Sequence, residues 1–325
     1  MNNAIEIADL AKSFGATRAV DGIDLQVRRG TVYGLLGPNG AGKTTAVRLL
    51  ATLLQPDRGG GRVLGHDLVG EPAAVRRKVS LTGQFASVDD ELTGLENLIL
   101  VGRLLGLSWR EAKRRALELL EAFELSEAAG RQVRTYSGGM RRRLDVGASL
   151  VLTPELLFLD EPTTGLDPRS RGQVWEIVRS IAGQGTTVLL TTQYLDEADR
   201  LADRLAVIDQ GRLIAEGTSL DLKAQVGGQV LQVRLEEKER MDEAARLLER
   251  VFGPEVRNGS DPRTLSVQVA GDAKVAEAFT ALSAAGLSVS EFALGQPSLD
   301  EVFFALTGRP VEERGGDEYP TEVPT

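Results

Sequence analysis

The sequence has no cysteine and only one histidine, His66, among its 325 residues. The absence of cysteine excludes disulfides and thiolate metal sites. A lone histidine has no partner for a metal site and no obvious nucleophile, so we expect His66 to be a surface or turn residue. No stretch approaches the roughly 18 apolar residues of a membrane-spanning helix. The first residues also lack the basic and apolar pattern of a signal peptide.

The chain is acidic, with a formal net charge of −9. Nucleic-acid binding depends on positive surface charge, so the composition gives no support for that class of partner. The length is enough for about two or three domains. We expect a cytoplasmic protein that touches a membrane only through a partner.

A glycine-rich stretch, Gly37–Thr45, reads G-P-N-G-A-G-K-T-T and matches the phosphate-loop pattern G-x-x-x-x-G-K-[ST]. Its glycines let the backbone turn N–H groups inward toward an anion. Lys43 would place a positive charge at the β- and γ-phosphates, and Thr44 would offer a hydroxyl to Mg²⁺. The alternative is a glycine-rich turn with a surface lysine. It is disfavoured because Thr31–Gly37 has the apolar run of a buried strand and Thr44–Leu54 has the apolar spacing of a helix.

Two carboxylates end a second apolar run, L-L-F-L-D-E, at Asp160 and Glu161. The run predicts a buried strand that delivers both acids to its C-terminal edge, where α/β proteins bind ligands. Asp160 suits the Mg²⁺ sphere, and Glu161 suits a base that activates water. The alternative is a plain strand end at a solvated turn.

A mainly helical block separates the strand predicted at Val79–Thr82 from this acidic strand. Capping boxes begin helices at Thr93 and Ser108, each with glutamate three residues later. The block ends at Tyr136–Met140, whose Ser-Gly-Gly turn could bind an anion at a helix start, although such turns are common. We interpret residues 85–150 as a helical subdomain inserted in an α/β domain of residues 1–222.

The second half of the chain has a different element order. Residues 228–308 predict β-α-β-β-α-β, the order of a small α+β, ferredoxin-like domain. This half has no acid pair and no glycine-rich loop, so we interpret it as a regulatory or dimer-contact module. Residues 309–325 are charged and rich in glycine and proline, which predicts a disordered tail.

Taken together, the motifs resemble those of ATP-binding cassette (ABC) ATPases. The phosphate loop, Gln84, Ser-Gly-Gly, Leu-x-Leu-Asp-Glu and Gly-Leu-Asp occur in that family's order over about residues 3–220. The resemblance implies an ABC fold that binds ATP and Mg²⁺. It assigns nucleotide contacts to Phe14, Gly37, Pro38, Asn39, Gly40, Ala41, Gly42, Lys43, Thr44, Thr45, Gln84, Ser137, Gly138, Gly139, Asp160 and Asp167, and metal contacts to Thr44, Gln84 and Asp160.

The resemblance also implies individual roles. Phe14 would stack on adenine, although taken alone an aromatic there is more readily explained as a core residue. Gln84 would sense Mg²⁺ and the membrane partner. Tyr136–Met140 would complete the ATP site of the opposite subunit, and Asp167 would link the two sites across the dimer. Catalysis would fall to Glu161, Gln193 and Lys43.

The chain departs from the general family pattern at the switch histidine, where it has Gln193 in T-T-Q-Y-L-D-E-A-D. A glutamine amide can donate a hydrogen bond to a γ-phosphate but cannot carry a proton. The signature also has Tyr136 and Met140 in place of the more frequent leucine and glutamine. These stretches, with L-G-Q-P-S-L-D-E-V-F-F-A-L-T-G, resemble the daunorubicin-resistance type of drug-exporter ATPase, in which this glutamine is usual.

The resemblance therefore implies a homodimeric ATPase that powers a separate integral membrane permease, which exports a drug or other small hydrophobic compound. The chain would lie on the inner face of the cell membrane through that permease. One alternative is a soluble ABC ATPase of DNA repair or translation, although such proteins usually have two cassettes or a long coiled coil. A phosphate-loop kinase would leave the Ser-Gly-Gly turn and Glu161 unexplained.

Overall fold

A computed structural model describes residues 2–83, 88–226, 229–254, 256–258, 261–269 and 272–307. The chain divides into two compact units, Met1–Ser219 and Leu220–Pro310. This division falls at the start of α8 (Ser219–Val226). The predicted domain boundaries, 1–222 and 228–308, remain predictions. The tail predicted at 309–325 and Gln84 lie outside the described residues.

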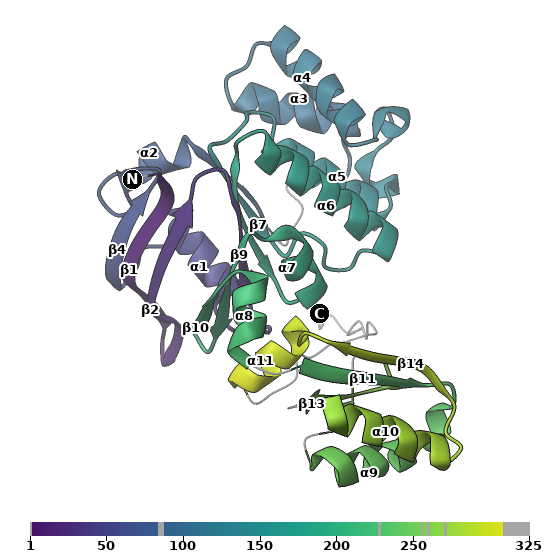
Figure 1. Ribbon diagram of the computed structural model, residues 1–325. Helices are drawn as coiled ribbons and strands as arrows, with labels where there is room; N and C mark the ends of the chain where they lie inside the picture. Colours follow the sequence, from purple (N-terminus) through teal and green to yellow (C-terminus); the bar gives the residue numbers. More distant parts are fainter. Residues whose placement is uncertain are drawn as a thin grey trace, which may run out of the picture. The chain divides into compact units, whose positions relative to one another are not determined.

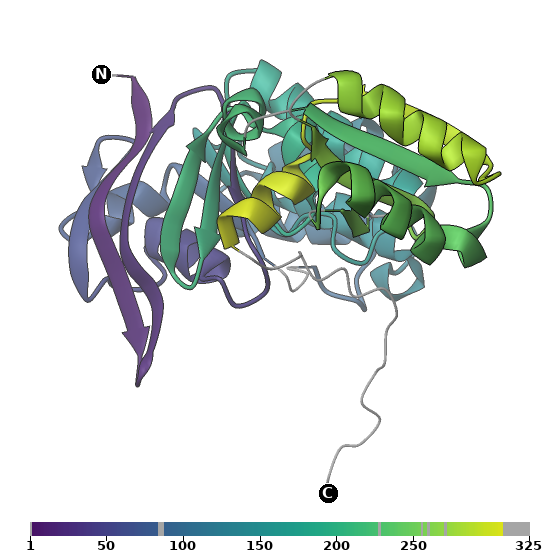
Figure 2. The same cartoon turned by 60° about the horizontal axis from the view of Figure 1, so that its bottom comes forward.

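The first unit contains two β-sheets, coloured purple to teal in Figure 1. A six-stranded sheet has the order β10-β9-β3-β8-β7-β6 and is parallel except for the β9–β10 hairpin. An antiparallel sheet has the order β2-β1-β4-β5, and its long β1–β2 hairpin is seen best in Figure 2. The strands are β1 (Asn3–Phe14), β2 (Thr17–Arg28), β3 (Val32–Leu36), β4 (Arg58–Val63), β5 (His66–Asp67), β6 (Val79–Thr82), β7 (Leu156–Asp160), β8 (Thr187–Thr192), β9 (Arg204–Asp209) and β10 (Arg212–Gly217).

Both faces of the six-stranded sheet are buried, which explains why its central strands are continuous apolar runs. Successive side chains alternate between the faces. On β7, Leu156 and Phe158 join the core that contains α1 and the antiparallel sheet, whereas Leu157 and Leu159 join the core beneath α3–α6. The helices are α1 (Lys43–Leu50), α2 (Pro72–Arg76), α3 (Gly94–Leu104), α4 (Trp109–Ala122), α5 (Gly138–Ser149), α6 (Pro168–Gly183) and α7 (Leu195–Leu201), with 3₁₀ turns η1 (Ser126–Ala128) and η2 (Val133–Thr135).

The helical block lies between β6 and β7, as predicted from the sequence. Both capping boxes are confirmed: Thr93 caps α3 with Glu96, and Ser108 caps α4 with Glu111. The buried face of α4 consists of Ala112, Ala116, Leu119 and Leu120. His66 lies in the two-residue strand β5 and pairs with Glu71 at 3.4 Å. Its side chain is partly exposed, in agreement with the predicted surface position, and its backbone pairs with Val63 of β4 across a two-residue turn.

The second unit has the predicted element order. Its sheet has the antiparallel order β12-β13-β11-β14, and α9 and α10 pack on one face of it (Figure 1). The elements are β11 (Gln229–Leu235), η3 (Lys238–Arg240), α9 (Met241–Phe252), β12 (Arg257–Asn258), β13 (Thr264–Val269), α10 (Asp272–Ala284), β14 (Val289–Gly295) and α11 (Leu299–Thr307). In the described part of the chain, every helix is too short or too polar to cross a membrane.

Candidate active site

The phosphate loop connects β3 to α1 at the C-terminal edge of the six-stranded sheet. Two glycines are required by close backbone approach. A Cβ at Gly37 would lie 2.2 Å from the Ile208 carbonyl oxygen, and one at Gly42 would lie 2.1 Å from that of Ala19. Gly42 also has φ +104°, which disfavours any other residue. Asn39 and Gly40 are exposed at the loop tip.

Lys43 begins α1 and is almost fully buried. Its ammonium donates to the carbonyl oxygens of Gly37 at 2.7 Å and Pro38 at 3.0 Å, and lies 3.3 Å from Glu161 Oε1. Burial lowers the pKa of Lys43, while Glu161 and Asp160 oppose that shift. The loop therefore holds its cation folded back onto its own carbonyls and the neighbouring carboxylate.

The carboxylate of Asp160 accepts two hydroxyl hydrogen bonds at one oxygen. Thr44 Oγ1 lies 3.1 Å from Asp160 Oδ1, and Thr191 Oγ1 lies 2.6 Å from it. Hydroxyl and carboxylate oxygens are the hard ligands that Mg²⁺ accepts. Thr44 and Asp160 therefore fit a Mg²⁺ site.

Glu161 has an unusual backbone conformation for a residue with a side chain, with φ +49°. Its N–H is held by the carbonyl of Thr191 at 3.1 Å and by Thr191 Oγ1 at 3.0 Å. Its other carboxylate oxygen accepts from Thr164 Oγ1 at 3.2 Å. Left-handed conformations of such residues cost free energy and persist where surrounding contacts enforce them. This turn aims Glu161 back at Lys43.

The signature turn and the Gly-Leu-Asp motif each begin a helix. Ser137 caps α5 by accepting from Met140 N at 3.3 Å, and both Ser137 and Gly138 are exposed. Asp167 caps α6 by accepting from the backbone of Arg169 and Ser170, each at 3.0 Å. The pKa of Asp167 is lowered, first by the Ser170 hydroxyl and then by these N–H groups.

The other predicted site residues differ in how exposed their side chains are. Phe14 is 51% exposed at the end of β1, with Lys12 Nζ 5.9 Å from its ring centroid, so the alternative of a core residue is wrong. Gln193 follows β8 directly and is half-buried. Ala41 is buried and Thr45 half-buried in the phosphate loop and α1.

Three residues near the site were not predicted from the sequence. Thr191 binds both Asp160 and Glu161, Arg142 binds the backbone around Asp160, and Glu197 is buried with no exposed surface. Glu197 Oε1 accepts from Thr163 Oγ1 at 2.9 Å and Trp175 Nε1 at 3.1 Å. In the sequence, Thr191 is a polar residue in an apolar strand, whereas Arg142 and Glu197 lie in charged stretches, and such signals are too common to single out.

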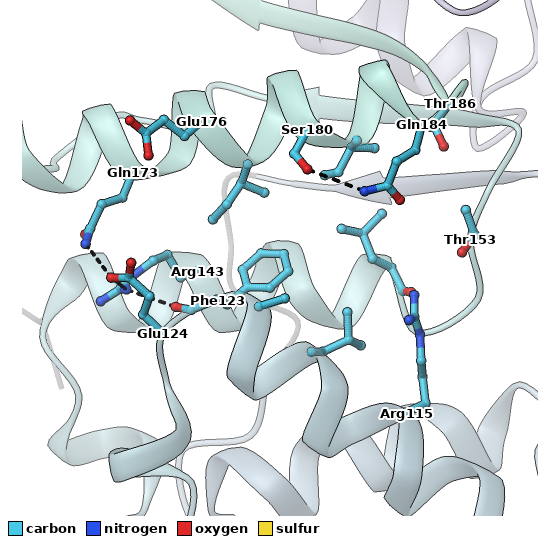
Figure 3. A pocket seen from close by; sticks show the side chains of 15 residues that line it. Arg115, Phe123, Glu124, Arg143, Thr153, Gln173, Glu176, Ser180, Gln184 and Thr186 are labelled. Carbon is cyan, nitrogen blue, oxygen red and sulfur yellow. Dashed lines mark hydrogen bonds and ion pairs between the residues drawn. The ribbon is translucent and has the colours of Figure 1, made fainter.

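A cavity of about 380 Å³ between α4 and α6 lies outside this cluster. Figure 3 shows the two helices across it, with Gln173 donating to Glu124 at 3.0 Å and Arg143 to the carbonyl of Phe123 at 2.9 Å. None of the predicted site residues lines it. It is therefore not part of the phosphate-binding geometry.

Comparisons with known proteins cover both units. A family model described as ABC transporter matches residues 20–164, and one described as ATP-binding protein DrrA1-3-like, C-terminal domain, matches residues 217–307. The chain is 58% identical over 319 residues to the daunorubicin/doxorubicin resistance ATP-binding protein DrrA of Streptomyces peucetius, which covers 98% of this chain and 97% of that protein. The chain belongs to the DrrA family of ABC ATPases.

Other relatives agree with this DrrA-family assignment. The chain is 45% identical to the doxorubicin resistance ATP-binding protein DrrA of Mycobacterium tuberculosis, which covers 95% of each chain. A solved structure described as an ATP-binding subunit of an ABC transporter superposes with a TM-score of 0.62 at 31% identity, over 69% of this chain and 93% of that one. These findings confirm the predicted ABC ATPase fold. They also show that this DrrA-family protein is an ABC-type ATPase.

Proposed function

We propose that this chain hydrolyses ATP as a homodimer and powers a separate membrane permease that exports a drug or other small hydrophobic compound. The observation that carries the hydrolytic part is the convergence of Lys43, Thr44, Asp160 and Glu161 at one sheet edge. The full-length similarity to proteins named for daunorubicin and doxorubicin resistance supports the export part. The relatives reported above give no support to the alternative of DNA repair or translation.

The residues suggest how hydrolysis would proceed. ATP would draw the Lys43 ammonium from the loop carbonyls to the β- and γ-phosphates, which releases Glu161. Glu161 would accept the proton of the water that attacks the γ-phosphorus, while ADP leaves. Gln193 would donate a hydrogen bond to the γ-phosphate. Bound Mg²⁺, held by Thr44 and Asp160, would neutralise phosphate charge.

The homodimer follows from two half-sites on one chain. The phosphate loop supplies one set of contacts, and the Ser137 turn, which is exposed at the N-terminus of α5, supplies a second anion-binding position. A two-fold dimer would bring Lys43 of one protomer and Ser137 of its partner to the same ATP. Phe14, exposed beside Lys12, is free to stack on adenine.

An exposed apolar surface on the helical block supports contact with a permease. Leu100, Leu104 and Leu105, at the end of α3, are exposed, with Leu104 at 77%. Leu105 also lines a cavity of about 580 Å³ together with Arg76, Arg77 and other residues. Exposed apolar groups beside a hollow mark interaction surfaces. We expect a short permease segment with apolar and acidic side chains to bind there.

The test is co-purification of the tagged chain from membranes of its own host. We expect a multi-span membrane protein with the parent chain, its loss with Leu104→Glu, and its retention with the control Leu117→Glu, a 47% exposed leucine on α4. ATP hydrolysis by the isolated variants should stay unchanged, because neither residue touches the site. Recovery of nucleic acid or ribosomes in place of a membrane protein would contradict the proposal.

A further inference from the structure

The guanidinium of Arg142 connects separate parts of the first unit. Its Nε donates to the carbonyl of Pro162 at 2.9 Å, and Nη2 donates to that of Asp160 at 3.1 Å. Nη1 donates to the carbonyl of Gly83 at 2.8 Å and to Asp145 Oδ2 at 3.1 Å. One side chain on α5 thus binds the two carbonyls that flank Glu161, at the end of β7, and the carbonyl that directly follows β6.

This arginine is buried at a cost in solvation. Its side chain is 12% exposed, and that of its counter-ion Asp145 is 1% exposed. Desolvation lowers the pKa of Arg142, and Asp145 and Asp160 oppose that shift. A buried ion pair is often no more stabilising than apolar residues of the same volume. Fixed backbone geometry around Asp160 therefore explains this arginine better than stability does.

The same helix also contacts the other end of the loop that follows Glu161. Gly139, in the first turn of α5, packs so closely on Ser170 that a Cβ would lie 2.3 Å from its hydroxyl oxygen. Ser170 Oγ in turn donates to Asp167 Oδ2 at 2.7 Å. The loop from Glu161 to Asp167 is thus fastened to α5 near both of its ends.

The N-terminal turn of α5 relates these contacts to the ATP that the partner would bind in the proposed homodimer. Ser137 caps α5, and Arg142 follows five residues later, about 7.5 Å along the helix axis. Both residues belong to one continuous helix, α5, so a shift of its N-terminal turn along the helix axis would displace Arg142 as well. In the proposed homodimer, the ligand at Ser137 is the ATP held by the partner's phosphate loop.

We propose that Arg142 is a positioning residue that relays occupancy of the Ser137 turn to the backbone of Asp160–Pro162. The ATP bound at one site thereby sets the orientation of Glu161 at the other. The inference rests on the proposed homodimer. Arginine is required because its planar group directs several donors at once, whereas a lysine ammonium cannot hold three carbonyls in that arrangement.

The test compares Arg142→Lys with Arg141→Lys, a neighbour on the same helix whose surface pair with Asp90 at 2.8 Å leaves it 38% exposed. ATP hydrolysis is measured against ATP concentration, together with binding of a fluorescent ATP analogue and the unfolding temperature. We expect Arg142→Lys to bind nucleotide like the parent, to lose roughly 10²-fold in kcat, and to lose its cooperativity in ATP. Arg141→Lys should behave as the parent in all three measurements.

A second variant guards against misfolding caused by an unpaired buried charge. Arg142→Gln combined with Asp145→Asn removes both charges together, and it should show the same loss of kcat and cooperativity with nucleotide binding retained. Unchanged kcat and cooperativity in either folded variant would overturn the proposal, as would losses that Arg141→Lys shares. A Glu161→Gln variant that stays monomeric in ATP and Mg²⁺ would overturn the homodimer itself. A dimer with unchanged Arg142→Lys kinetics would overturn only the role of Arg142.

Discussion

Lys43 Nζ and Glu161 Oε1 lie 3.3 Å apart, and their side chains are 4% and 7% exposed. The cation expected at the phosphates therefore lies beside the expected base. In the proposed mechanism, ATP separates this pair before Glu161 accepts a proton. Nucleotide binding and release of the base are thus linked by one contact.

Replacing Lys43 tests this link. Lys43→Ala should abolish ATP hydrolysis and weaken ATP binding, because one charge at the β- and γ-phosphates is lost. It should also destabilise the nucleotide-free protein by about 3–5 kcal/mol, since Glu161 is left buried without its partner. ATPase assays and urea unfolding measure both effects, with Lys78→Ala, which breaks a surface pair with Glu155, as the control. Unchanged hydrolysis would rule out the assigned site.

Removing the base while keeping the shape of the side chain tests assembly. Glu161→Gln should bind ATP without splitting it, because an amide cannot accept the proton. The variant should accumulate as a dimer in ATP and Mg²⁺ and dissociate when nucleotide is removed. Light scattering that finds only monomer under both conditions would contradict the two-fold arrangement.

The glutamine in place of a switch histidine should position the phosphate. Gln193→Ala loses one hydrogen bond to a charged group, worth about 1.5–3 kcal/mol. Turnover should fall by roughly the corresponding 10- to 150-fold, with nucleotide binding less affected. Loss of binding without loss of turnover at saturating ATP would assign Gln193 a different role.

The lone histidine should have no part in catalysis. His66 pairs with Glu71 in the antiparallel sheet, away from the residues around Asp160. An acid limb in the pH–rate profile should therefore belong to a carboxylate or to ATP, and His66→Asn should leave it in place. If this substitution removes the limb, or if Glu161→Gln keeps most of the activity, the mechanism is wrong.

Glu197 makes stability depend on pH in a direction that can be measured. Burial raises the pKa of this carboxyl, against the hydrogen bonds from Thr163 and Trp175. Because the pKa of Glu197 is higher in the folded protein, its protonated form adds to the free energy of unfolding, and this stabilisation is complete below the unfolded pKa of about 4.5. The stabilisation is lost as the pH rises through the pKa of the folded protein. Glu197→Gln does not titrate, so its stability relative to the parent should increase from about pH 5 to about pH 8 in urea unfolding. A constant difference across that range would show that Glu197 is charged throughout.

The sequence predicted the elements whose signals are local. The phosphate loop, the acidic strand end and the two capping boxes are each set by residues within a few positions of one another, so pattern and spacing suffice. The pairing of His66 with Val63 across a two-residue turn is local as well. Exposure of Phe14, in contrast, depends on where β1 ends in its sheet, which spacing does not reveal.

The sequence by itself determined which residues could bind phosphate, metal and water, because each motif is contiguous. Only the tertiary structure decided that they meet. The sheet order places β8 between β3 and β7, so Thr191 of β8 reaches Asp160 and Glu161, and the loop after β3 brings Lys43 to the same edge. Strand order is set by packing of the whole core rather than by any local pattern. For the same reason Arg142 and Glu197, whose partners are distant in the sequence, became visible only in the folded chain.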